Sequence, residues 1–218
     1  MSQRPVLYVL AGVNGAGKSS IGGQHLLEVS GMPWFDPDTF AREYREATGC
    51  GQEEANATAW GEGMRRLDEA VANGTNYAFE TTLGGRTVPA KIAMAAATHD
   101  VAIWYCGLAS PELHIARVKA RVAAGGHDIP EGKIRERYES SLLNLIALLP
   151  RVSSLMTYDN SQQAGPGESI PDPVLVLDLY AGEVLFPDTA SAIQATPDWV
   201  KPLVEAALSE HGYPGTYA

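Results

Sequence analysis

The residues from Gly12 to Ser19 read Gly-Val-Asn-Gly-Ala-Gly-Lys-Ser, which matches the phosphate-binding pattern Gly-x-x-x-x-Gly-Lys-Ser. Glycines in such a loop let consecutive backbone N–H groups point at a polyphosphate, while the lysine reaches the outer phosphates and the serine can hold Mg²⁺. The alternative is a glycine-rich turn that binds nothing, but the complete spacing and the flanking segments favour nucleotide binding. The residues expected to bind it are Gly12, Asn14, Gly15, Ala16, Gly17, Lys18, Ser19 and Ser20.

The segments around this loop predict a strand-to-helix turn. Val6–Ala11 is an apolar run typical of a strand buried on both faces, and Ser19–Val29 has the pattern of a helix. Strand and helix patterns then alternate along most of the chain, which predicts an α/β fold with a doubly wound, mainly parallel sheet. Further strands are expected at Met32–Phe35, Tyr77–Phe79, Val101–Cys106 and Leu155–Tyr158, and further helices at Thr39–Ala47, Glu53–Ala72, Val88–Ala97, Ser110–Ala124 and Asp128–Leu149.

Polar side chains follow directly after two of these predicted strands. Asp36 and Asp38 follow one strand, and Glu80, Thr81 and Thr82 follow the next. Ligands of such sheets bind outside the carboxyl ends of the strands, so these residues should converge on the phosphate loop. A carboxylate there can accept the proton of an attacking hydroxyl or anchor the Mg²⁺ shell. The alternatives are helix capping for the aspartates and a solvent-exposed strand end for the glutamate.

Two of the predicted helices carry basic residues and are joined by a loop that contains a glycine pair. Because residues four apart share a helix face, Arg117 is grouped with Arg121 and Lys133 with Arg137, whereas Arg135 points elsewhere. Such helices predict a lid that closes over phosphates, excludes water and places arginine where negative charge develops.

The alternative for the lid segment is a pair of surface helices with ordinary solvated charges. These charges include Lys119 and a weak Glu131–Arg135 pair. Asp128–Glu131 resembles a capping box, so the second helix is expected to begin there. The lone His127 is expected to act in a turn or cap rather than as a metal ligand.

Composition limits the class of protein. The chain has 218 residues, of which 45% are hydrophobic, enough for one α/β domain with a full core and an extension. Its net charge of −10 argues against a broad nucleic-acid surface. Cys50 and Cys106 lack metal-type spacing, and no segment resembles a signal peptide or a membrane helix. These features predict a reduced, cytoplasmic protein without membrane or nucleic-acid partners.

Taken together, the motifs resemble the zeta toxin family of P-loop kinases, in particular its short stand-alone bacterial members. The resemblance covers roughly Val6 to Leu149 and is carried by the phosphate loop, by Phe35–Ala41, by Phe79–Leu83 and by the segment from Arg121 to Tyr138. The chain departs from the larger toxins in its length, its Gly-Gly-His-Asp lid and its C-terminal hairpin.

This resemblance implies phosphorylation of a sugar hydroxyl of UDP-N-acetylglucosamine by ATP or GTP, with Mg²⁺ at Ser19. It implies that Asp38 is the general base, with Asp36 as second choice, and that Arg121 with Arg135 or Arg137 stabilises the γ-phosphoryl group. It also implies an antitoxin partner. Arg117 and Arg137 are expected to bind the nucleotide together with the loop residues, and Lys18 is expected to take part in catalysis. The residues expected to bind the acceptor are Asp36, Glu80, Thr82 and Arg86.

By this reading residues 1–161 form a P-loop kinase core with a lid at about 117–138. Residues 162–218 form an extension packed on it, with a β-hairpin at Val174–Tyr180 and Glu183–Phe186 and a helix at Asp198–Ser209 that carries Trp199. Asp159–Ser161 is expected to face the nucleotide base. Other readings are a kinase for another sugar or antibiotic hydroxyl, a nucleotide-dependent regulatory ATPase without acceptor, and a binding scaffold. A GTPase switch lacks support because no Asn-Lys-x-Asp segment follows a strand.

Overall fold

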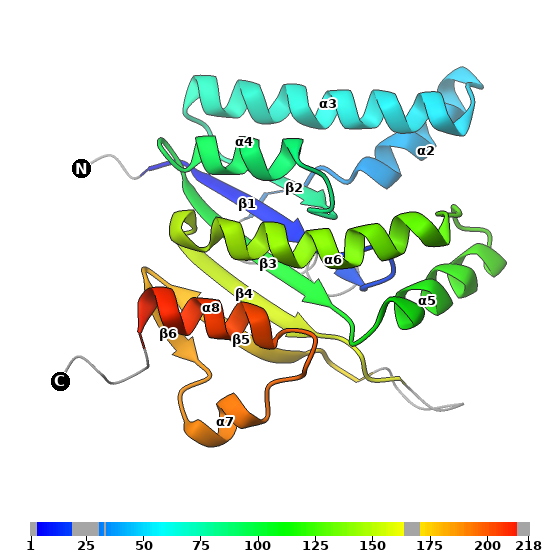
Figure 1. The fold of residues 1–218 in the computed structure, drawn as a ribbon. Helices are drawn as coiled ribbons and strands as arrows, with labels where there is room; N and C mark the ends of the chain where they lie inside the picture. Colours follow the sequence, from blue (N-terminus) through cyan, green and yellow to red (C-terminus); the bar gives the residue numbers. More distant parts are fainter. Residues whose placement is uncertain (1–3, 19–30, 33, 164–170, 213–218) are drawn as a thin grey trace.

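The computed structural model describes residues 4–18, 31–32, 34–163 and 171–212, which form a six-stranded sheet (Figure 1). The strand order is β2-β1-β3-β4-β5-β6, in which β1 pairs in parallel with β2 and β3, and β3 with β4. The last two strands are antiparallel to their neighbours. This confirms the α/β fold with a mainly parallel sheet. The strands are β1 (Val6–Ala11), β2 (Tyr77–Thr81), β3 (Asp100–Gly107), β4 (Ser154–Asp159), β5 (Val174–Tyr180) and β6 (Glu183–Phe186).

The strand order places the phosphate loop at the point where the direction of winding reverses. From β1 the chain moves outward to β2 on one side and then crosses to β3 on the other. The loop after β1 therefore opens into the crevice between the carboxyl ends of β1 and β3, where such sheets bind ligands. The start of the loop lies so close to β3 that a Cβ atom on Gly12 would be 2.1 Å from the carbonyl oxygen of Cys106.

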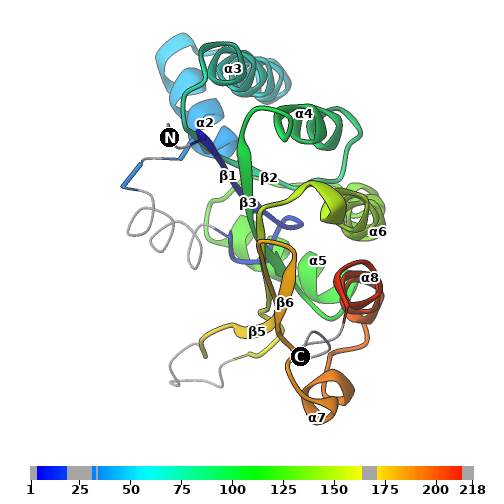
Figure 2. The same ribbon diagram turned by 90° about the vertical axis from the view of Figure 1, so that its left-hand side faces the viewer.

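Three helices, α4, α6 and α8, cover one face of the sheet, as Figure 2 shows edge-on. The main core lies at this interface and includes Val9, Ile103 and Leu155 from the sheet and Leu145 and Leu203 from the helices. Helices α2 and α3 pack together at the β2 side, and α5 lies beyond the carboxyl ends of the strands (Figure 1). The helices are α2 (Pro37–Thr48), α3 (Gln52–Asn73), α4 (Thr87–Ala95), α5 (Pro111–Ala123), α6 (Glu131–Leu148), α7 (Ala190–Gln194) and α8 (Lys201–His211).

The strand predicted at Met32–Phe35 is reduced to one bridge. Phe35 pairs with Phe79 beside β2, with Phe35 N–H donating to Ala78 O and Glu80 N–H donating to Phe35 O. Asp36 already forms the cap of α2, so the pairing ends at Phe35. Pro33 of the predicted strand lies outside the described residues. The predicted helix Ser19–Val29 lies outside the described residues.

The predicted capping box is wrong. Helix α6 begins at Glu131 with Pro130 as its N-cap, and the Asp128 carboxylate accepts instead from the Ile129 N–H at 2.8 Å. Proline offers no side-chain acceptor and holds an extended backbone, which places the aspartate outside the first turn. In contrast, Ser110 caps α5 as its Ser-Pro sequence predicts, because its hydroxyl accepts from Leu113 N–H.

The C-terminal segment extends the same sheet through the predicted hairpin of β5 and β6. Trp199 precedes α8 instead of lying on it, because that helix begins at Lys201. Its indole ring packs directly on Gly107 of β3, where a Cβ atom would come within 2.2 Å of the ring. Among the helices in the described ranges, none has the length and apolar composition that a bilayer crossing requires.

Candidate active site

The phosphate loop is held from several sides by β3, β4 and α5. Its Gly12, Gly15 and Gly17 have positive φ values of 140°, 83° and 90°, which only glycine adopts readily. The Ala16 carbonyl oxygen accepts from the Asn160 side-chain amide at 2.9 Å and from the Cys106 thiol at 3.1 Å. These contacts fix the curl of the loop. The predicted ligands Ser19 and Ser20 lie outside the described residues.

His114 on α5 contacts the backbone of the phosphate loop. The sequence alone did not identify this residue. Its Nδ1 lies 2.9 Å from the Asn14 carbonyl oxygen, and its ring meets Tyr138 edge-on at 5.7 Å. Burial lowers the pKa of His114 to about 4, and the positive charges of Lys18 and Arg117 act in the same direction. The imidazole is therefore neutral near pH 7, with Nδ1–H donating to the loop. Its only sequence signal was a place on the helix face that also carries Val118.

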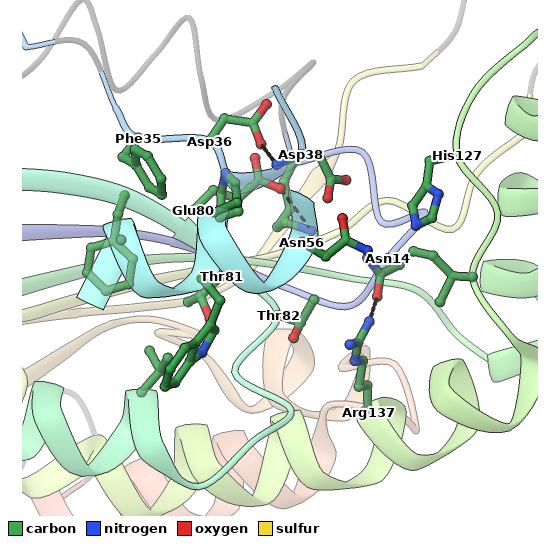
Figure 3. A pocket seen from close by; sticks show the side chains of 18 of the residues that line it. Asn14, Phe35, Asp36, Asp38, Asn56, Glu80, Thr81, Thr82, His127 and Arg137 are labelled. Carbon is green, nitrogen blue, oxygen red and sulfur yellow. Dashed lines mark hydrogen bonds and ion pairs between the residues drawn. The ribbon is translucent and has the colours of Figure 1, made fainter. Parts of the chain in front are cut away.

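Two adjoining cavities lie beside the loop. The smaller, of about 400 Å³, runs between α3, the end of β2 and α6. The larger, of about 940 Å³, runs between the loop, α2 and α5. Figure 3 shows the smaller cavity, with Asp38, Glu80, Thr82 and Arg137 directed around it. The residues that line both cavities are Asn14, Lys18, Asp36, Asp38, Asn56, Glu80, His127 and Asp128.

The charged groups between the two cavities are arranged around the loop lysine. Lys18 Nζ lies 3.3 Å from Glu80 Oε1, and the two side chains are only 6% and 12% exposed. Arg121 Nη1 lies 3.8 Å from Asp38 Oδ2, while Arg137 Nη1 donates to the Asn14 side-chain oxygen at 2.7 Å. Cations and carboxylates thus alternate where the two cavities join.

The two candidate bases have different surroundings. Asp36 caps α2, since one carboxylate oxygen accepts from Asp38 N–H at 2.9 Å and the other from the Thr39 hydroxyl at 2.7 Å. Asp38 lies one residue into the helix, and its side chain is 56% exposed with Arg121 beside it. The structure therefore gives the capping role to Asp36 and leaves the Asp38 carboxylate open to the cavities.

The turn after β2, which carries the predicted acceptor residue Thr82, is held by polar side chains of α6 that sequence reasoning did not single out. Ser141 donates to Thr82 O at 2.7 Å, and the Asn144 amide donates to Leu83 O at 2.6 Å and Gly85 O at 2.8 Å. Leu83 has a φ of 53°, an uncommon conformation for a leucine. The α6 contacts hold this turn, and hence Thr82, in place.

The basic residues of α5 and α6 that reach the cavities divide into two groups. Arg117 and Arg121 line the larger cavity, and Arg137 with Lys133 lines the smaller one. Arg117 donates to Asn160 O at 2.7 Å, and Arg121 donates to His127 O at 3.0 Å. The Asp159–Ser161 segment expected near the nucleotide base is thus tied to the Arg117 guanidinium.

Two predicted site residues are not brought to the cavities. Arg135 pairs with Glu112 at 2.6 Å on the outer surface, and Lys119 pairs with Glu131 at 2.7 Å. The Glu131–Arg135 pair named in the surface-helix alternative is therefore replaced by these two pairs. Arg86 is an exposed residue before α4. Neither arginine lines the two cavities.

The phosphate loop lies at the switch point of a mainly parallel sheet, which is the arrangement of a P-loop kinase fold. The zeta toxin family model matches residues 1–160, so the chain belongs to the zeta toxin family. An uncharacterized protein of Haemophilus influenzae is 27% identical over 139 residues, which cover 63% of this chain and 94% of that protein.

Two solved structures share the fold at low identity. A structure of the PezAT toxin-antitoxin system of Streptococcus pneumoniae has a TM-score of 0.54 and 17% identity, covering 72% of this chain and 68% of that chain. A structure of AvrRxo1-ORF1:-ORF2 with ATP has a TM-score of 0.61 and 13% identity, covering 99% of this chain and 65% of that chain.

Proposed function

We propose that the protein transfers the γ-phosphoryl group of ATP or GTP to a hydroxyl of a UDP-amino sugar such as UDP-N-acetylglucosamine. The observation that carries this proposal is the junction of the two cavities at Lys18, Asp38 and Glu80. A donor in the larger cavity and an acceptor in the smaller one would meet beside the loop lysine. Holding two reactants in contact supplies much of the rate enhancement of phosphoryl transfer.

The donor side follows from the loop. Its N–H groups and Lys18 bind the phosphates, while Arg117 and Arg121 line the same cavity. In the described part of the chain, no group of three or more histidine, cysteine or acidic side chains is placed to hold a metal ion. Mg²⁺ in kinases is held largely by substrate phosphates, and Ser19 is the expected protein ligand. Bound there, the ion neutralises charge on the phosphates.

The acceptor side follows from the carboxylates. Asp38 takes the proton of the attacking hydroxyl, a role supported by its open carboxylate in both cavities and by the capping role of Asp36. Glu80 and Thr82 bind the acceptor. Arg121 and Arg137 stabilise the transferred group, and Arg137 is preferred to Arg135 because it lines the smaller cavity.

The direct test is an ADP-release assay with ATP or GTP, Mg²⁺ and a panel of UDP-sugars, free sugars and hydroxylated antibiotics, with the product identified by mass spectrometry. We expect ADP only with a UDP-amino sugar present, together with a product heavier by one phosphoryl group. ADP formation at full rate without any acceptor contradicts the proposal and favours a regulatory ATPase. Transfer to another hydroxyl compound retains the kinase and replaces the acceptor. For substitutions of the proposed base Asp38, the matched control is Asp188→Asn, which changes an exposed carboxylate outside both cavities.

An antitoxin partner is a second part of the proposal, supported by membership of the family. Induced expression of the chain alone in a bacterial host should slow growth, and the Lys18→Ala variant should not. Equal growth of both strains, at equal protein levels, contradicts a toxic activity.

A further inference from the structure

The smaller cavity has an aromatic side chain at its wall that the proposed reaction leaves without a role. Trp60 on α3 is 54% exposed, whereas Trp34, Trp104 and Trp199 are all partly buried. A tryptophan side chain usually buries most of its large apolar surface. Trp60 instead presents its ring beside the cavity that also contains Asp38 and Glu80.

Trp60 belongs to one face of α3 that forms a continuous cavity wall. Asn56, Ala59, Trp60, Gly63 and Met64 follow the i, i+3, i+4 pattern of one helix face, and all line the cavity. The α3 wall is mostly apolar, with the Asn56 amide toward its N-terminal end. The helix therefore supplies a surface suited to the face of a ring.

Close packing of Phe35, which also lines this cavity, positions the wall. The Phe35 ring lies so close to α3 that a Cβ atom on Gly63 would come within 2.9 Å of it. The same ring is 5.6 Å from the Phe40 ring and 4.9 Å from the Arg66 guanidinium. Within the described ranges, the Trp60 indole makes no side-chain hydrogen bond and no ring contact. The wall is thus fixed, and the indole face is available to a ligand.

The rest of the cavity lining adds polar groups to apolar ones such as Val88 and Ile129. It contains the Glu80 carboxylate, the Thr82 hydroxyl and the Arg137 guanidinium, together with Asp38 at the junction. A ligand in this cavity must present polar groups at its edge and an apolar face toward α3. A sugar ring has this character, because its hydroxyls project from the edge while its C–H groups form a face.

We propose that Trp60 stacks on the sugar ring that carries the reacting hydroxyl and thereby determines acceptor specificity. We assign the hexose ring to this position, and not the uracil ring, because Trp60 shares its cavity with Asp38, the proposed general base. This assignment rests on the proposed function. It extends that function by giving the cavity wall of α3 the task of selecting ring-shaped acceptors.

The kinetic test compares Trp60→Ala, Trp60→Leu and Trp60→Phe with the wild type. Losing one aromatic stacking contact should raise the KM for the acceptor by roughly tenfold in the alanine and leucine variants, with the KM for ATP within about twofold. The phenylalanine variant should retain most of the affinity. Leucine keeps apolar volume but has no aromatic face, so this variant distinguishes ring stacking from simple filling of the cavity. Met94→Ala removes another exposed apolar side chain, on α4 outside both cavities, and should change neither KM.

A binding test separates failure of this inference from failure of the proposed function. Tryptophan fluorescence is titrated with UDP-N-acetylglucosamine, N-acetylglucosamine and UDP, each in the wild type and in Trp60→Phe. We expect ligands with the sugar ring to change the fluorescence of the wild type only. If the wild type phosphorylates a UDP-sugar and Trp60→Ala keeps its acceptor KM, the inference is wrong and the proposed function stands. A Trp60-dependent response to UDP alone overturns the hexose assignment, and no binding or transfer with any acceptor overturns both.

Discussion

Lys18 and Glu80 form a buried ion pair, with Nζ 3.3 Å from Oε1. One residue belongs to the phosphate loop and the other to the end of β2, and both line the two cavities, so the pair lies where the proposed donor and acceptor sides meet. A buried charge that loses its partner is strongly unfavourable. The stability of the loop and the charge at the end of β2 are therefore coupled.

A double-mutant cycle measures this coupling. Because each substitution removes the opposite charge beside a buried charge, Glu80→Gln and Lys18→Met should each lower the free energy of unfolding by about 2 kcal/mol. The loss should be smaller than in a dry core, since both residues line cavities. The double variant should lose less than the sum of the two. Urea unfolding measures all four proteins. Strict additivity would contradict the coupling, and the exposed Lys201–Asp198 pair is the control that should show almost none.

The second prediction separates the two aspartates before and within α2. Asp38→Asn should lower kcat by roughly 10²- to 10⁴-fold because it removes the general base, with nucleotide affinity nearly unchanged. Asp36→Asn keeps one acceptor oxygen of the cap and should lose activity much less, while Asp36→Ala should cost about 1 kcal/mol of stability. Steady-state kinetics and titration with a fluorescent ATP analogue measure the two effects. Normal turnover by Asp38→Asn contradicts the assignment of the base.

The third prediction compares two arginines two residues apart on α6. Arg137 lines the smaller cavity and contacts Asn14, whereas Arg135 pairs with Glu112 at the surface. Arg137→Ala should lower kcat by about 100-fold if its charge acts on the transferred group. Arg135→Ala should stay within about twofold, since a surface ion pair contributes little. Equal losses in both variants contradict the placement of Arg137 and not Arg135 at the site.

The positions of the site residues show which features of the site could be predicted from the sequence. Lys18, Asp38 and Glu80 were predicted to meet, because parallel strands bring their carboxyl ends to one edge of a sheet. Helical spacing correctly separated Arg135 from Lys133 and Arg137, but only the family resemblance favoured Arg135 for catalysis. Which face of α6 meets the cavity depends on packing against the rest of the fold, which the helical period alone does not specify.

Other features depend on tertiary contacts that have no local signal. His114 and Asn144 look like ordinary helix residues in the sequence, and their roles come from backbone carbonyls far away in the chain. The capping-box prediction failed because Pro130 displaced the start of α6. Local patterns therefore predicted elements and strand ends better than the residues that support them.

The fourth prediction concerns pH. Since burial lowers the pKa of His114 to about 4 from 6.5, the unfolded chain binds more protons than the folded one between these values. Stability should therefore fall as the pH drops from about 6.5 towards 4, with His114 accounting for up to about 3 kcal/mol. His114→Gln keeps an N–H donor for Asn14 O but does not titrate, so its stability should depend less on pH in this window. Urea unfolding at several pH values compares the two proteins, and identical slopes contradict the prediction.

The last prediction concerns the docking of the C-terminal segment on β3. An added methyl group at Gly107 would overlap the Trp199 ring, since the Cβ would lie 2.2 Å from it. Gly107→Ala should therefore destabilise the protein by about 1–3 kcal/mol and expose residues after β6 to proteolysis. The same substitution at Gly61, a helical site with nothing within 4 Å of the added Cβ, should be neutral or stabilising. Combining Gly107→Ala with Trp199→Leu provides room for the methyl group, so the double variant should lose less than the sum of the two single losses. Additive losses in thermal unfolding would show that the two residues do not pack as described, and would separate the C-terminal helix from the stability of the sheet.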